Sequence, residues 1–177
     1  MRCLFYLYGG EMFEHSIGPF FDEKSNILIL GSFPSVKSRE ENFYYANKQN
    51  RFWKVLAQVF KDQVPESKSE KKDFLTAHRI ALWDVIASCE ILGSSDASIK
   101  NVTPSDISLI LENSPIEKLV LNGKKATQLF YRNQGSALPL RNCRAQVIEV
   151  YELPSTSPAN ASFSIDKLIA HWSIISK

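Results

Sequence analysis

Residues 31–53 hold most of the side chains in this 177-residue chain whose types and spacing could do chemistry. The segment reads GSFPSVKSREENFYYANKQNRFW. It joins a glycine turn to a group of aromatic rings, the carboxamides of Asn47 and Asn50, and a basic residue. A flat, uncharged ligand that forms hydrogen bonds needs rings to stack on and polar groups to orient it. The segment therefore predicts a pocket for a ligand such as a nucleobase.

A second polar loop, residues 153–160, reads LPSTSPAN. Two prolines restrict its backbone. Three consecutive hydroxyl groups, on Ser155, Thr156 and Ser157, could donate hydrogen bonds to phosphate oxygens. Clusters of proline and serine are also common in ordinary turns. Whether this loop binds a ligand or is only a turn therefore depends on where the fold places it.

An alternation of strands and helices must position these two loops. Apolar runs predict strands at 26–30, at 80–86 with its end near Asp84, at 116–121 and at 146–150. Helical periodicity predicts helices at 50–60, 124–132 and 165–175. Thr103-Pro104 predicts a further helix start, and Ser67 with Glu70 predicts a capping box.

This alternation predicts an α/β fold, with a single three-layer α/β/α domain around a central four-stranded, mainly parallel sheet. In such sheets, ligands bind at the edge formed by the carboxyl ends of the strands. Both polar loops follow a predicted strand. We therefore expect residues 31–53 and 153–160 to meet at that edge.

The bulk composition excludes several classes of protein. A formal net charge of +2 permits nucleic-acid binding without arguing for it. The cysteines Cys3, Cys89 and Cys143 form no CxxC pair, so we expect no metal centre and a reducing, cytoplasmic location. No apolar run approaches the roughly 20 residues of a membrane span, so we expect no membrane partner.

Together the two motifs resemble those of the uracil-DNA glycosylase superfamily, most closely its hypoxanthine-DNA (deoxyinosine) glycosylase branch. The matching stretches are GSFPS at 31–35, NRFW at 50–53, LWDVIASCE at 82–90 and LPSTSPAN at 153–160. Two positions depart from the pattern of many relatives: Phe33 replaces an Asp or Asn, and Leu153 replaces a His or Asn. The resemblance implies an N-terminal extension at residues 1–24 and a glycosylase-like domain at residues 25–177.

The resemblance also implies an activity. The expected protein is a monofunctional DNA glycosylase of base-excision repair that hydrolyses the N-glycosidic bond of deaminated nucleotides. Hypoxanthine is the first expected base, with uracil or xanthine as others. Such an enzyme requires no cofactor and no metal. Its partner is DNA containing deaminated bases, and we expect it to act as a monomer.

The same resemblance assigns roles within the two motifs. Asn50 is implied as the catalytic carboxamide that holds water against the sugar, and Tyr45 as the ring on which the flipped base stacks. The backbone N–H groups of Ser32 and Phe33 could donate to a base oxygen. The remaining expected contacts to the base or its flanking phosphates are Gly31, Pro34, Asn47, Leu153, Pro154, Ser155, Thr156, Ser157 and Asn160. Additional basic contacts could come from Lys37, Arg39, Lys48 and Arg51.

These assignments have competing interpretations. Asn50 precedes a predicted helix and could simply cap it, while Asn47 could position the water instead. Phe33 lacks a polar atom, which motivates the alternative of a non-catalytic nucleic-acid or nucleotide-binding module on the same fold. A hydrolase of small nucleosides or esters is disfavoured, because Ser32 and Ser35 lack the Gly-x-Ser-x-Gly spacing. The histidines are scattered and are interpreted as surface or packing residues.

Overall fold

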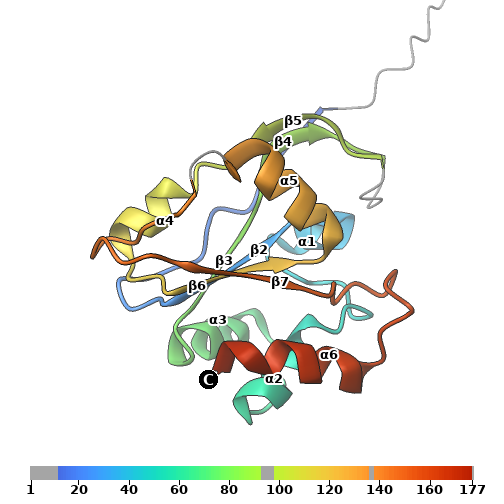
Figure 1. The fold of residues 1–177 in the computed structure, drawn as a ribbon. Coiled ribbons are helices and arrows are strands. Elements are labelled where there is room, and N and C mark those ends of the chain that lie inside the picture. Colours follow the sequence, from blue (N-terminus) through green and yellow to red (C-terminus); the bar gives the residue numbers. More distant parts are fainter. Residues whose placement is uncertain (1–11, 93–97, 136–137, 177) are drawn as a thin grey trace, which may run out of the picture.

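A four-stranded parallel sheet forms the centre of the molecule (Figure 1). The computed structural model describes residues 12–92, 98–135 and 138–176. The order of the strands is β3 (Ile80–Asp84), β2 (Ile27–Gly31), β6 (Lys118–Asn122) and β7 (Glu149–Leu153). The register places Gly31 opposite Asp84 and Asn122 opposite Leu153, so the four strands end at one edge.

Helices cover one face of this sheet. They are α2 (Phe52–Phe60), α3 (Lys68–Ala77) and α6 (Ile165–Trp172), which continues into the 3₁₀ helix η3 (Ser173–Ser176). Successive side chains of a strand point to opposite faces. Ile27 and Ile29 of β2 therefore pack into the core beside these helices, while Leu28 and Leu30 pack into a second core on the other face.

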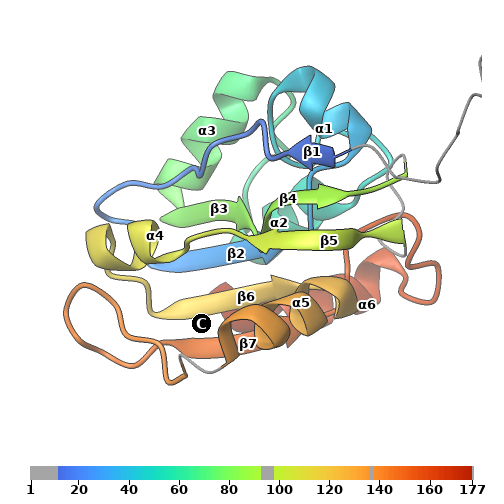
Figure 2. The same cartoon turned by 90° about the horizontal axis from the view of Figure 1, so that it is seen from above.

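Helices and a second sheet together cover the opposite face (Figure 2). The helices are α4 (Ser108–Asn113) and α5 (Lys124–Gln134). The second sheet is antiparallel and has the order β1 (Met12–Glu14), β4 (Ile86–Glu90), β5 (Lys100–Pro104). A short helix, α1 (Val36–Glu41), follows β2.

The predicted three-layer α/β/α architecture with a central four-stranded parallel sheet is confirmed. The capping box is confirmed as well, because Ser67 Oγ accepts the Glu70 N–H at 3.1 Å and Glu70 Oε2 accepts the Ser67 N–H at 3.1 Å. The antiparallel sheet is an addition that the sequence pattern did not predict. The predicted helix from residue 50 begins at Phe52.

The predicted helix start at Thr103-Pro104 is wrong. Both residues belong to β5, where Thr103 pairs with Ser88 and Pro104 with Ile86. Because β5 lies at the edge of its sheet and Pro104 is its last residue, the strand tolerates a proline there. The strand predicted at 146–150 also moves, to Glu149–Leu153.

The described part of the predicted extension packs on the domain. Strand β1 pairs with β4, and Phe20 forms a bridge with Leu82 of β3. Residues 1–11 lie outside the described part of the chain. Among the described helices, none has the length and apolar character that a membrane crossing needs. The described residues also contain no group of three or more His, Cys, Asp or Glu side chains that could hold a metal ion.

Candidate active site

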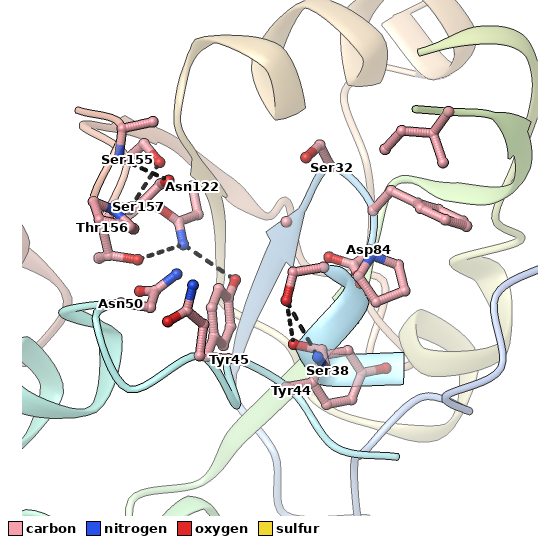
Figure 3. A pocket seen from close by; sticks show the side chains of 18 residues that line it. Ser32, Ser38, Tyr44, Tyr45, Asn50, Asp84, Asn122, Ser155, Thr156 and Ser157 are labelled. Carbon is pink, nitrogen blue, oxygen red and sulfur yellow. Dashed lines mark hydrogen bonds between the residues drawn. The ribbon is translucent and has the colours of Figure 1, made fainter. Parts of the chain in front are cut away.

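The carboxyl edge of the parallel sheet holds a cavity of about 280 Å³ (Figure 3). Three strand ends lie at it, namely Gly31 of β2, Asp84 of β3 and Asn122 of β6. Most of the remaining wall comes from the loops after β2 and β7, which are far apart in the sequence. The volume is near the lower end of the roughly 300–1,000 Å³ found for small-molecule pockets. The cavity therefore suits a single small ring system.

Most of the predicted contact residues line this cavity. They are Gly31, Ser32, Phe33, Pro34, Tyr45, Asn47, Asn50, Ser155, Thr156 and Ser157. Leu153, Pro154 and Asn160 do not line it. Leu153 packs in the core, the Pro154 carbonyl accepts a hydrogen bond from Trp172 Nε1 at 3.0 Å, and Asn160 Nδ2 donates to the Ser155 carbonyl at 2.9 Å. These three residues shape the second loop instead of facing the cavity.

Tyr45 is held by contacts on several sides. Its ring stacks on Phe52 with the ring centroids 3.7 Å apart and an interplanar angle of 15°. Trp53 Nε1 donates to its carbonyl at 3.2 Å. Its φ of 49° lies in the left-handed region that residues other than glycine rarely adopt. Its neighbours Phe43 and Tyr44 are buried in the core. Tyr44 also lines the cavity, but Tyr45 is the more exposed of the two rings there.

Asn122, which the sequence interpretation did not include in the site, connects the two loops. Its Nδ2 donates to the Tyr45 hydroxyl at 3.1 Å and to Thr156 Oγ1 at 3.2 Å, while its Oδ1 accepts the Thr156 N–H at 3.1 Å (Figure 3). Thr156 is fully buried by these contacts. The signal that could have found Asn122 is a polar residue at the end of an apolar strand, the position where α/β sheets bind ligands.

Gly123 lets the second loop approach the sheet. Its φ is +97°, a conformation that favours glycine. A Cβ at this position would lie 2.6 Å from Ser155 Cβ. The turn after β6 can therefore sit directly against the loop only without a side chain.

Arg51 fastens the second loop to the start of α2. Its guanidinium donates to the carbonyls of Thr156 at 3.3 Å, Ser157 at 2.6 Å and Asn160 at 3.1 Å, and also to that of Phe163. Its backbone N–H donates to the Thr156 carbonyl at 3.1 Å. The expected role of Arg51 as a basic contact is thus replaced by a role inside the protein.

The two candidate water-positioning amides both line the cavity. The N-cap of α2 is Arg51, so Asn50 does not cap the helix. Asn50 Oδ1 instead accepts the Phe52 N–H at 3.0 Å, which forms an Asx turn just before the helix. Asn47 Oδ1 accepts the Gln49 N–H at 3.0 Å. An amide oxygen has two lone pairs and the amide nitrogen has two donors. Asn50 can therefore bind the Phe52 N–H and still offer hydrogen-bonding groups to a ligand.

Asp84 is a second cavity residue that the sequence interpretation did not include. It is 4% exposed, and His15 Nε2 lies 2.8 Å from its Oδ2. Burial raises the pKa of the Tyr44 phenol well above its usual value, and charge interactions with Asp84 and Tyr45 raise it further. Tyr44 therefore stays neutral and donates to the Gly18 carbonyl at 2.9 Å.

A larger groove of about 710 Å³ adjoins the cavity and shares Tyr45, Asn47 and Asn50 with it. Its wall carries the lysines Lys37, Lys48, Lys54, Lys68 and Lys71 beside the acidic Glu41 and Glu66. Positive charge exceeds negative charge along this wall. The groove is therefore suited to an anionic polymer that continues out of the cavity.

The sequence model of the uracil DNA glycosylase superfamily matches residues 19–172. A hypoxanthine DNA glycosylase of Methanosarcina acetivorans is 35% identical over 155 residues, which are 86% of this chain and 92% of the relative. A hypoxanthine DNA glycosylase of Methanosarcina barkeri is 32% identical over 117 residues, which are 65% of this chain and 74% of the relative. A solution NMR structure from M. acetivorans, provisionally described as a uracil DNA glycosylase, superposes with a TM-score of 0.75 at 29% identity and covers 93% of this chain and 96% of its own.

Proposed function

We propose that this chain, which belongs to the uracil DNA glycosylase superfamily, is a DNA glycosylase that removes deaminated bases, hypoxanthine before uracil or xanthine. The observation that carries the proposal is the meeting of two distant loops at one cavity. Residues 31–50 bring an aromatic ring and a carboxamide to it, and residues 155–157 close it from the other side. The same cavity would serve the alternative, a binding module without cleavage, so the chemistry must be argued from the residues.

The target base must leave the duplex before its bond to the sugar can be reached. Extrusion costs a few kcal/mol, and it costs least for a damaged or mispaired base. Stacking on an aromatic ring recovers about 1–3 kcal/mol. Phe52 covers one face of the Tyr45 ring, so the base would stack on the other. Asn122 and Trp53 hold Tyr45 in place by hydrogen bonds. The Tyr45 side chain therefore loses little conformational freedom when a base binds.

Hydrolysis places the water oxygen on C1′ of the sugar, the base leaves with the electrons of the glycosidic bond, and the proton that the water loses ends on the released base. Negative charge develops on the base and positive charge on the sugar. The backbone N–H groups of Ser32 and Phe33 would stabilise a base oxygen. An amide is a poor base, so Asn50 would act by orienting the water and by its dipole. Phe33 offers no polar side chain, and in this mechanism none is needed there.

The second loop would hold the DNA backbone beside the flipped nucleotide. Ser155 Oγ accepts the Ser157 N–H at 3.2 Å, and Ser157 Oγ accepts the Ala159 N–H at 3.3 Å. Each hydroxyl hydrogen can then be donated outward to a phosphate oxygen. Thr156 is fully buried against Asn122. The expected phosphate contact of Thr156 is therefore reassigned to the two serines that flank it.

A cleavage assay tests the proposal. Purified protein is incubated with labelled duplexes that hold one deoxyinosine, deoxyuridine or deoxyxanthosine, and alkali then converts abasic sites to strand breaks. We expect the fastest cleavage at deoxyinosine. Tight binding to these duplexes with no breaks in any of them would support the binding module and contradict a glycosylase.

The lysine groove, defined by the five lysines named above, leads to a second prediction. Replacing Lys48 and Lys54 with alanine should weaken duplex binding and reduce the slope of log K against log salt by about 0.9 for each phosphate that is no longer neutralised. The single-turnover rate at saturating protein should stay near that of wild type. The matched control replaces Lys24 and Lys72, which are exposed but outside the groove. An equal loss of affinity in the control, or none in either variant, would show that the groove does not carry the DNA.

A further inference from the structure

The lysine groove continues directly from the cavity that would hold the flipped base. The two spaces share the wall residues Tyr45, Asn47 and Asn50. Tyr45 and Asn50 lie close together on one side of the cavity (Figure 3). The groove has a volume of about 710 Å³, against about 280 Å³ for the cavity. A DNA strand whose base is in the cavity therefore passes over this shared wall, and the groove has room for the next nucleotide along the strand.

The charges of the groove suit the backbone of that strand. Its wall carries five lysines and two glutamates. Lys37 is paired with Glu41 at 3.1 Å, which takes one charge of each sign out of this count. Four lysines then remain on the wall against Glu66. This excess of positive charge can neutralise the phosphates on either side of a bound nucleotide.

The groove also presents apolar surface, which a site for phosphates alone would not need. Val64 is 43% exposed on its wall. Lys68 Nζ lies 5.6 Å from the centroid of the buried Phe43 ring. Lys71 Nζ lies at the same distance from the centroid of the buried Trp53 ring, so the hydrocarbon stems of both lysines cover apolar side chains. Proteins hold single strands in positive grooves that also offer surface to the bases.

A paired nucleotide cannot use both parts of this surface. In a duplex the two backbones lie outside and the bases are stacked and paired between them, so only phosphates and sugars would reach the wall. An unpaired nucleotide presents its phosphate and its base together. The apolar part of the groove, next to its positive charge, therefore favours a nucleotide that has left the duplex.

We propose that the lysine groove is a second nucleotide subsite, which holds the unpaired neighbour of the flipped nucleotide on the same strand. The inference rests on the proposed function and names its substrate class, a deaminated base beside a nucleotide that is itself mispaired or unpaired. Taking a nucleotide out of the stack costs free energy, and a mispaired nucleotide costs least. A substrate whose neighbour is already unpaired therefore reaches the bound state more easily than a fully paired one.

The test compares duplexes that hold one deoxyinosine and differ only in a neighbouring pair. One duplex has a mismatch at the 5′ neighbour and the other has it at the 3′ neighbour. Either mismatch loosens the stack around deoxyinosine, but only one of the two neighbours can lie in the groove. At subsaturating protein we expect the wild type to cleave one duplex about tenfold faster than the other, because saving part of an unstacking cost changes a rate by about an order of magnitude. Equal rates on the two duplexes would overturn the inference.

Variants of Val64 show whether the groove causes this difference. Val64→Asp puts a carboxylate on the apolar wall and should reduce the difference between the two duplexes to about twofold. Val64→Leu keeps the wall apolar and should preserve it. The matched control is Val147→Asp, at a residue that is 53% exposed just before β7 and outside the groove, and it should change neither rate. A difference that persists in Val64→Asp would overturn this inference alone, whereas a wild type that cleaves no duplex would overturn the proposed function as well.

Discussion

Replacing Asn50 with alanine is expected to slow excision of hypoxanthine by about 100- to 1,000-fold, the usual effect of removing one preorganised polar group from a reacting centre. Asn50 lies in the cavity wall near Tyr45 and the second loop. In the proposed mechanism, its loss removes the group that orients the water and leaves the stacking surface intact. Affinity for the deoxyinosine duplex should therefore stay within a few-fold of wild type while the single-turnover rate falls.

The Asx-turn bond of Asn50 calls for a second variant. Asn50 Oδ1 accepts the Phe52 N–H, and losing such a hydrogen bond costs about 1 kcal/mol of stability. A serine hydroxyl can form the same turn bond but cannot replace the amide. Asn50→Ser should therefore regain the thermal stability that alanine loses and remain as inactive. A serine variant with nearly normal cleavage would show that Asn50 serves only α2.

Asn47 provides the comparison for this position. It also lines the cavity, and its Oδ1 accepts the Gln49 N–H. Asn47→Ala should lower the cleavage rate by about tenfold at most, because in this account its amide does not hold the attacking water. If Asn47→Ala is the more damaging substitution, the water is held by Asn47 and the assignment of Asn50 must be reversed.

Replacing Arg51 with methionine is expected to damage both stability and activity. The guanidinium donates to carbonyls of Thr156, Ser157, Asn160 and Phe163, all in the second loop and its exit. Hydrogen bonds from a charged group contribute about 1.5–3 kcal/mol each, so losing several at once should lower the free energy of unfolding by about 3 kcal/mol or more. Without these hydrogen bonds from Arg51, Ser155 and Ser157 would no longer be held at the cavity. Cleavage should then become barely detectable.

Urea unfolding, limited proteolysis and the cleavage assay measure these effects. Arg51→Lys should recover less than half of the lost stability. One ammonium group cannot reproduce the planar guanidinium, whose N–H groups donate to several carbonyls at once. Arg132→Met, on the exposed side of α5, is the control and should behave as wild type. A stable, active Arg51→Met protein would mean that the loop is held by other contacts, such as those of Asn122.

The parts of the fold that follow from local pattern were open to prediction. The apolar runs that became β2, β3 and β6 lie in buried parallel strands, and such strands appear as short continuous apolar runs. The meeting of the two loops follows from that topology, because parallel strands share a carboxyl edge. The end of strand β5 was predicted as a helix start, because Thr103-Pro104 is a typical signal for the start of a helix. The pairing of these residues with β4, which makes them part of a strand, is a contact that the local sequence does not show.

The parts that depend on contacts between distant residues were not open to prediction. Arg51 meets its loop partners across 105 to 112 residues, and in the sequence it is simply one of several basic residues. Asp84 and His15 are 69 residues apart. Their contact requires the pairing of β1 with β4, and neither strand was predicted. The His15 side chain is buried, in keeping with a packing residue, yet its partner lies in the cavity wall.

A crystal structure of the Asn50→Ser variant bound to a duplex with one deoxyinosine tests the central claim most directly. We expect the hypoxanthine outside the helix stack and inside the cavity of Figure 3, with one face on the Tyr45 ring and the flanking phosphates at Ser155 and Ser157. A base that stays stacked in the duplex, or one seated elsewhere while this cavity remains empty, would contradict the account.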